Sequence, residues 1–126
     1  MTMVAEPVSH ARPRVPPLQN GDRLTRAAFE CCQRMGFAPD IIHANDWHTA
    51  FAPLLLRAAY AWDTARFGAA KSVFTIHNIG YQGVFSAGRA GDLAPGVGVE
   101  SLHQPDLAAG HVNPMRHGVI YADAVT

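Results

Sequence analysis

Two short apolar runs in this chain of 126 residues each end in side chains that hydrogen-bond well. The first run leads into Asp46, Trp47 and His48, and the second ends in His77 and Asn78. Carboxylate, imidazole and amide groups together offer donors and acceptors, and a carboxylate also favours nearby positive charge. If the two clusters meet in space, they could hold a ligand rich in hydroxyl groups.

A metal site is the main chemical alternative, because His43, Asp46, His48 and His77 could form a hydrolytic cluster. His43 and His48 are spaced i, i+5 across an expected strand-to-helix turn, and no His-x-x-x-His or Cys-x-x-Cys pair accompanies them. We therefore predict no metal and no cofactor. His43 is interpreted as a hydrogen-bonded core histidine. The sequence assigns no role to the other histidines of the second half, His103, His111 and His117.

A β-α-β unit would bring the two clusters together. Residues 40–44 and 72–76 have the apolar, β-branched pattern of buried parallel strands, and the stretch 47–62 between them suits a helix. A parallel crossover needs about a dozen residues, which this interval supplies. Open α/β sheets bind ligands at the carboxyl ends of their strands. The sequence thus predicts an α/β fold with a Rossmann-like parallel sheet and flanking helices.

Simpler structural roles compete with the functional ones. Asp46 suits the N-cap of the following helix, in which Pro53 predicts a kink or a late start near Thr49. Trp62 is expected in the core, whereas Trp47 fits a core position and a ligand platform equally well.

The remaining elements are predicted from prolines, glycines and helix-capping residues. Four prolines within residues 1–19 predict a poorly ordered lead-in without regular helix. The glycine-rich stretch 79–110 is expected to be irregular. The other expected elements are a helix from Asn20 or Asp22 to Met35, a short helix capped by Asn113 with Pro114 at its first position, and the beginning of a strand in 122–126.

Composition excludes several classes of partner. The formal net charge is zero and Lys71 is the only lysine, so no basic stripe indicates nucleic acid. A bond between the adjacent Cys31 and Cys32 would be strained, which favours reduced thiols in a cytoplasmic protein. No apolar run approaches the roughly 18 residues of a membrane span, and no signal peptide is evident. The length limits the chain to one domain.

Three stretches of the sequence resemble a known protein family. Residues 39–57 (PDIIHANDWHTAFAPLLLR), 72–85 (SVFTIHNIGYQGVF) and 118–126 (GVIYADAVT) resemble, in order, the bacterial glycogen synthase and plant starch synthase family. The resemblance implies a retaining glycosyltransferase of the two-domain GT-B type. Such enzymes transfer glucose from a nucleotide sugar, ADP-glucose in bacteria and plastids, to the non-reducing end of an α-1,4-glucan. Residues 20–126 would form part of the N-terminal, acceptor-side domain.

The resemblance also implies roles for single residues. His77 matches the position that contacts the donor glucose, and Asp46 matches the acidic residue required for activity. The remaining residues of the same motifs would line the acceptor side, namely Trp47, His48, Asn78, Tyr81 and Gln82.

Two family features have no counterpart. The chain has no Lys-x-Gly-Gly loop and no second domain with cations for the donor phosphates. We expect a fragment that is inactive alone and that needs the C-terminal domain of the same enzyme. A non-catalytic half-domain that binds glucan or a partner is the alternative, and the choice between ADP-glucose and UDP-glucose stays open.

Overall fold

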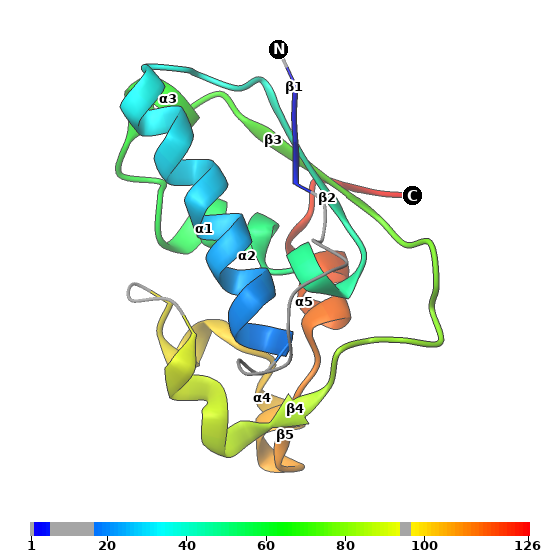
Figure 1. The fold of residues 1–126 in the computed structure, drawn as a ribbon. Coiled ribbons are helices and arrows are strands. Elements are labelled where there is room, and N and C mark those ends of the chain that lie inside the picture. The colour runs from blue at the N-terminus through cyan, green and yellow to red at the C-terminus, as the bar shows by residue number, and fades with distance from the viewer. Residues whose placement is uncertain (1, 6–16, 94–96) are drawn as a thin grey trace.

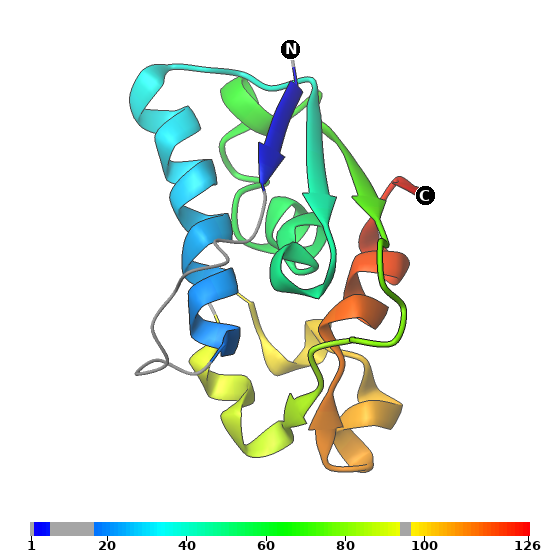
Figure 2. The same ribbon diagram turned by 45° about the vertical axis from the view of Figure 1, so that its right-hand side comes forward.

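The centre of the computed structural model is a four-stranded parallel sheet (Figure 1). The structure describes residues 2–5, 17–93 and 97–126, without the side chains of 17–21. Neighbouring strands are parallel throughout the order β1-β2-β3-β6, and Figure 2 shows β1 to β3 pointing the same way. The strands span Thr2–Ala5 (β1), Ile41–Asn45 (β2), Lys71–Thr75 (β3) and Ala124–Val125 (β6). The predicted α/β fold is confirmed.

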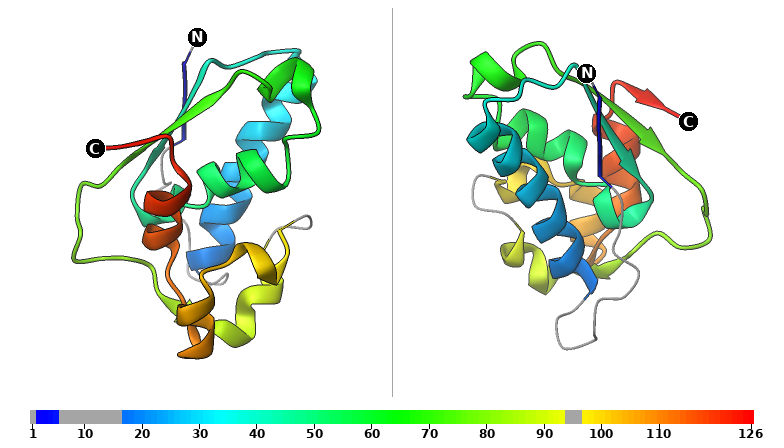
Figure 3. Two further views of the ribbon diagram at one scale, coloured as in Figure 1. Left: turned by 180° about the vertical axis from the view of Figure 1, so that it is seen from behind. Right: turned by 45° about the horizontal axis from the view of Figure 1, so that its top comes forward.

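Three helices cover one face of this sheet (Figure 3). Burial alternates along the strands as the pleat requires: Ile42, Ala44 and Phe74 are fully buried, whereas His43 and Val73 on the other face are half-buried. The apolar side chains of the helices therefore form the core against the first set. These helices are α1 (Pro17–Met35), α2 (Ala52–Ala58) and α5 (Pro114–Tyr121).

The stretch 79–110 is less irregular than expected, because several short elements break it up. Buried Asp106 stabilises this region: its Oδ1 lies 2.7 Å from Nη1 of Arg116 and 3.4 Å from Nε2 of His111. The short elements of the chain are α3 (Thr64–Phe67), α4 (Gln104–Ala108), the antiparallel pair β4 (Phe85–Ser86) and β5 (His111–Val112), and the 3-10 helices η1 (Trp47–Thr49), η2 (Ala87–Asp92) and η3 (Val99–Ser101).

The amino-terminal region departs from its prediction. Residues 2–5 form β1, because their backbone pairs with β2 before the prolines begin. Helix α1 starts at Pro17, earlier than expected, since proline is tolerated in the first helical turn. Residues 1 and 6–16 of the expected lead-in lie outside the described residues. The division of the chain at residue 19 stays a prediction.

The expected helix 47–62 is also different. It is split into η1 and α2, with Pro53 in the first turn of α2, which agrees with the predicted late start. Because α2 ends at Ala58, Trp62 falls in the turn beyond it and is 74% exposed, so its expected core position is wrong. The short helix capped by Asn113 and the strand β6 are confirmed.

The structure also describes the two cysteines and the apolar character of the helices. Cys31 and Cys32 are both free thiols, the first exposed and the second buried. Among the described residues, no helix is long and apolar enough to cross a membrane.

Candidate active site

The two predicted clusters meet at the carboxyl ends of β2 and β3. Asn45 pairs with Thr75 in the parallel register, so the residues that follow them leave the sheet side by side. The carboxylate oxygen Oδ1 of Asp46 accepts the backbone N–H of His77 at 2.7 Å and that of Asn78 at 3.4 Å. One side chain thereby holds the first turn of the neighbouring loop.

Asp46 reaches this position with an unusual backbone. Its φ of 58° and ψ of 179° make it the one non-glycine residue with positive φ in the described part of the chain. Such conformations cost about 1–3 kcal/mol and concentrate at functional sites. Asp46 stands at the N-cap position of the 3-10 helix that follows, as predicted, but its side chain makes no capping bond to that helix. The bonds to the neighbouring loop use only Oδ1 and leave Oδ2 for a ligand.

The ring of His77 is oriented by a buried amide that the sequence analysis overlooked. Its Nε2 lies 3.0 Å from Oδ1 of Asn45, which can only accept a hydrogen bond, so Nε2 carries the proton. In this tautomer Nδ1 is the acceptor. Asn45 is itself held by Thr49, whose hydroxyl accepts the Asn45 N–H and donates to its carbonyl, both at 2.8 Å.

Aromatic rings lie beside these polar groups. Trp47 stacks on His48 with ring centres 3.9 Å apart, and its ring centre lies 5.8 Å from that of Tyr81. Gly83 lets the loop approach Trp47: its φ is +75°, and a Cβ there would lie 2.2 Å from Cε3 of Trp47. Trp47 is half-buried, whereas Tyr81 is 64% exposed. The indole is thus fixed in place, and the phenol is free to contact a ligand.

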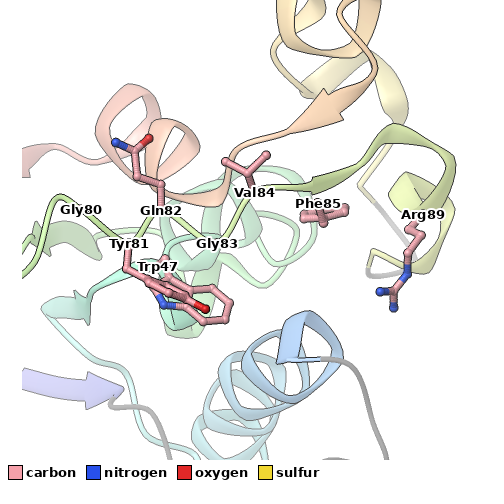
Figure 4. A pocket seen from close by; sticks show the side chains of 8 residues that line it. All are labelled: Trp47, Gly80, Tyr81, Gln82, Gly83, Val84, Phe85 and Arg89. Atoms are coloured by element: carbon pink, nitrogen blue, oxygen red, sulfur yellow. The ribbon is translucent and has the colours of Figure 1, made fainter.

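Two hollows open around this aromatic pair. The first, the Asp46 hollow, has a volume of about 480 Å³ and is lined by Asp46, Trp47, His48, Asn78 and Tyr81. The second, about 580 Å³, is shown in Figure 4 and is lined by Trp47, residues 80–85 and Arg89. Since Trp47 and Tyr81 border both, the hollows form adjoining parts of one surface. Five of the seven predicted site residues line the Asp46 hollow.

Gln82 and His77 are the two that do not. Figure 4 shows the Gln82 side chain pointing away from Tyr81. Its Nε2 donates to the carbonyl of Ile79 at 3.1 Å, and its Oε1 accepts from Asn113 at 2.7 Å. Both ends of the amide are used in holding the loop against α5, so Gln82 positions the loop. The exposed His77 lies next to the Asp46 hollow through its bond to Asp46.

The remaining polar groups show which chemistry the site favours. Burial lowers the pKa of His48, against the opposing effect of the Asp46 carboxylate, so its ring is neutral at pH 7. The ring of His43 bonds to the hydroxyl of Thr75 at 2.7 Å as predicted, but His43 is half-buried on the sheet face away from the helices and not in the core. Within the described ranges, no three His, Cys, Asp or Glu side chains are grouped to hold a metal ion. The Asp46 hollow therefore offers hydrogen-bond donors and acceptors, aromatic faces and one carboxylate.

Two residues of the stretch 118–126, which also resembles the family, lie away from the carboxyl edge of the sheet. Asp123 sits at the amino ends of the strands, where its Oδ2 accepts the N–H of Ser72 at 2.8 Å. The Tyr121 hydroxyl donates to the carbonyl of Ser101. Both residues join segments of the fold. Arg89, which borders the second hollow and bonds Asp92 at 3.4 Å, had no sequence signal because it lies in the glycine-rich stretch.

The sheet and this edge define a Rossmann-like α/β domain with a polar and aromatic ligand surface at the carboxyl ends of its strands. Residues 18–126 match the family described as "Starch synthase catalytic domain", and the chain belongs to that family.

The chain is similar to larger proteins. It is 45% identical over 101 residues to a glycogen synthase of Streptococcus uberis and 38% identical over 109 residues to one of Photobacterium profundum. The matches include 79% and 84% of this chain, respectively, and the chain spans about 21% of the length of each relative. Among solved structures, the chain is similar to the catalytic domain of starch synthase IV from Arabidopsis thaliana, bound to ADP and acarbose. The two structures superpose with a TM-score of 0.77 at 32% identity, over 92% of this chain and 23% of the Arabidopsis chain.

Proposed function

We propose that this chain forms the acceptor side of a glycosyltransferase that moves glucose from ADP-glucose to the non-reducing end of an α-1,4-glucan with retention. The observation that carries the proposal is the bond from the His77 backbone to the carboxylate of the strained Asp46. It brings the loop that carries His77 next to a hollow lined by a carboxylate and an aromatic pair. Sugar rings present hydroxyl groups and apolar faces that fit such a wall.

The reaction explains why these groups are useful. Transfer passes through an oxocarbenium-like state, and a carboxylate such as Asp46 favours the positive charge that develops. Nδ1 of His77 and the amide of Asn78 can bind sugar hydroxyls. The leaving diphosphate needs cations or helix N-termini. In the walls of the two hollows the cation is Arg89, already paired with Asp92, so the donor phosphates would be bound by a further domain of the same enzyme.

The comparisons support the donor and acceptor classes. The Arabidopsis structure holds ADP, which is the leaving group of ADP-glucose, together with acarbose. The alternative is a half-domain that binds glucan without turnover. It is favoured by the walls of the two hollows, where the described cation, Arg89, is already paired with Asp92. This alternative predicts glucan binding at the same hollow with no transfer.

A chimera tests the proposal. The matching 101 residues of the Streptococcus uberis enzyme are replaced by those of this chain, and glucose transfer from ADP-glucose to maltoheptaose is measured. We expect transfer in the chimera and a loss of about 100-fold or more with His77→Ala. Ile79→Ala, an exposed residue of the same loop, is the matched control and should retain activity. A chimera that folds, binds maltoheptaose and transfers nothing would favour the half-domain.

A further inference from the structure

Three histidines that take no part in the candidate site gather around one buried carboxylate. Asp106 of α4 is 5% exposed, and its Oδ1 lies 2.7 Å from Nη1 of Arg116. Nε2 of His111 lies 3.4 Å from the same oxygen, and Nδ1 of His103 lies 3.2 Å from Oδ2. The third histidine, His117 on α5, is fully buried beside this group. The cluster thus places an imidazole that can take up a proton inside the fold.

His117 is held as a neutral ring by two partners of opposite kinds. Its Nε2 accepts the backbone N–H of His103 at 3.0 Å, so this nitrogen carries no proton. Its Nδ1 donates to the carbonyl of Asn113 at 2.7 Å. A second proton on the ring would turn Nε2 into a donor that faces another donor, and the bond to His103 would be lost.

The surroundings of the ring do not compensate for a second proton. The charged, titratable and aromatic groups that face it are His103, Asp106, Arg116, Tyr121 and Phe51. Asp106 attracts a proton to the ring, whereas His103 and Arg116 repel one, and burial is the main reason that the pKa of His117 is lowered. Because Asp106 is already paired with Arg116 at 2.7 Å, a charged His117 would have to reach water.

The residue that accepts from His117 also holds the loop that carries Tyr81. Nδ2 of Asn113 donates to Oε1 of Gln82 at 2.7 Å, while Oδ1 of Asn113 caps α5. Nε2 of Gln82 donates in turn to the carbonyl of Ile79 at 3.1 Å, which closes the loop that Figure 4 shows around Tyr81. A continuous series of hydrogen bonds therefore runs from His117 through Asn113 and Gln82 to the carboxyl edge of the sheet.

We propose that His117 is a proton-operated control of this loop: the neutral ring holds the loop in place, and the protonated ring releases it. The neutral ring keeps residues 103 and 113 at a fixed spacing, since it bonds to both. A charged ring needs water, so these two segments separate and Asn113 moves away from Gln82. The consequence for a ligand, weaker glucan binding in mild acid, rests on the proposed function, because Tyr81 borders both hollows.

NMR on the full chain, labelled with ¹³C and ¹⁵N, tests this control without any ligand. Spectra are recorded from pH 7.5 to 5 for the ring of His117 and the side-chain amide of Gln82. We expect both to change with the same midpoint, while the backbone amide of Phe29 in the core keeps the signal of the folded chain. His117→Gln keeps an acceptor and takes up no proton, so its Gln82 signal should stay in place. His111→Gln, from the same cluster, is the matched control and should leave the movement unchanged.

The outcomes decide between this control and other causes. Different midpoints for His117 and Gln82 in the wild type overturn it, even if His117→Gln does not fold. An equal movement of Gln82 in His117→Gln also overturns it and would assign the effect to another group, such as His48. Loss of the Phe29 signal in step with that of Gln82 shows unfolding of the whole chain and overturns a local control.

Maltoheptaose then tests the consequence for binding. Its Kd should weaken about tenfold between pH 7.5 and pH 5 in the wild type, and most of this change should be absent from His117→Gln. Equal Kd values at the two pH values in the wild type overturn the link between the loop and the ligand. Absence of binding at both pH values contradicts the proposed function, while the Gln82 signal still decides whether His117 controls the loop.

Discussion

The carboxylate of Asp46 holds the backbone N–H of His77 at 2.7 Å, joining the residue after one strand to the loop after the next. The bond fixes the Asp46 carboxylate relative to the backbone of His77, the other candidate catalytic residue. It also accounts for the backbone strain at Asp46, because a φ of 58° directs the side chain toward the neighbouring strand end and away from its own 3-10 helix.

Substitutions can separate the structural role of Asp46 from its chemical role. Asp46→Asn keeps an oxygen for the His77 N–H and tolerates positive φ, so we expect a loss of unfolding free energy below about 1 kcal/mol. Asp46→Ala loses the bond and keeps the strain, and should cost about 1–3 kcal/mol. Urea unfolding measures both. In the chimera, Asp46→Asn should still lose transfer, and wild-type transfer would show that the charge is dispensable.

Gly83 should be intolerant of any side chain. Gly83→Ala places a Cβ against Trp47 at a φ of +75°, and we expect a cost of about 1–3 kcal/mol with altered Trp47 fluorescence. Gly91→Ala is the matched control, because a Cβ there meets nothing within 4 Å. Equal unfolding free energies for the two variants would contradict the tight contact between the loop and the indole.

Tyr81 should affect binding and leave stability unchanged. The side chain is 64% exposed and borders both hollows at the carboxyl edge. Tyr81→Ala should weaken maltoheptaose binding at Trp47 about tenfold, since an aromatic contact is lost, and should change the unfolding free energy by less than about 0.5 kcal/mol. Val99→Ala, an exposed apolar residue outside both hollows, serves as the control. Unchanged affinity in Tyr81→Ala would remove Tyr81 from the site.

His117 should make stability fall in mild acid. It is fully buried, its Nε2 accepts the N–H of His103 at 3.0 Å, and its Nδ1 donates to the carbonyl of Asn113 at 2.7 Å. Burial lowers its pKa; the bond to Asn113 and the Asp106 carboxylate oppose this effect, and His103 and Arg116 add to it. The unfolded chain therefore binds the proton more readily, and the contribution present above about pH 6.5 is lost as pH falls through the folded pKa.

His117→Gln tests this pH dependence. Unfolding free energies are measured from pH 7.5 to 5. The wild-type slope includes up to about 1.4 kcal/mol per pH unit from this one proton, and the variant should lose that part. Some slope should remain, because burial also lowers the pKa of His48. Identical slopes would show that His117 does not control stability in this range.

Several features of the fold were recognisable because local chemistry decides them. The pattern of 40–44 and 72–76 indicated β2 and β3, and Asn113 before Pro114 marked the start of α5. Boundaries that depend on distant contacts were missed: β1 forms because its backbone pairs with β2, and Trp62 is exposed because α2 ends at Ala58.

The sequence by itself determined which residues would stand at the carboxyl ends of two parallel strands, since strand patterns and polar strand ends are local properties. Only the tertiary structure decided how they are used. The parallel register aligns Asn45 with Thr75 and lets Asp46 bond the backbone of His77 instead of capping its own helix. The same packing commits Gln82 to α5. Each of these bonds joins residues about 30 positions apart in sequence, and their geometry exists only once the sheet and α5 are packed.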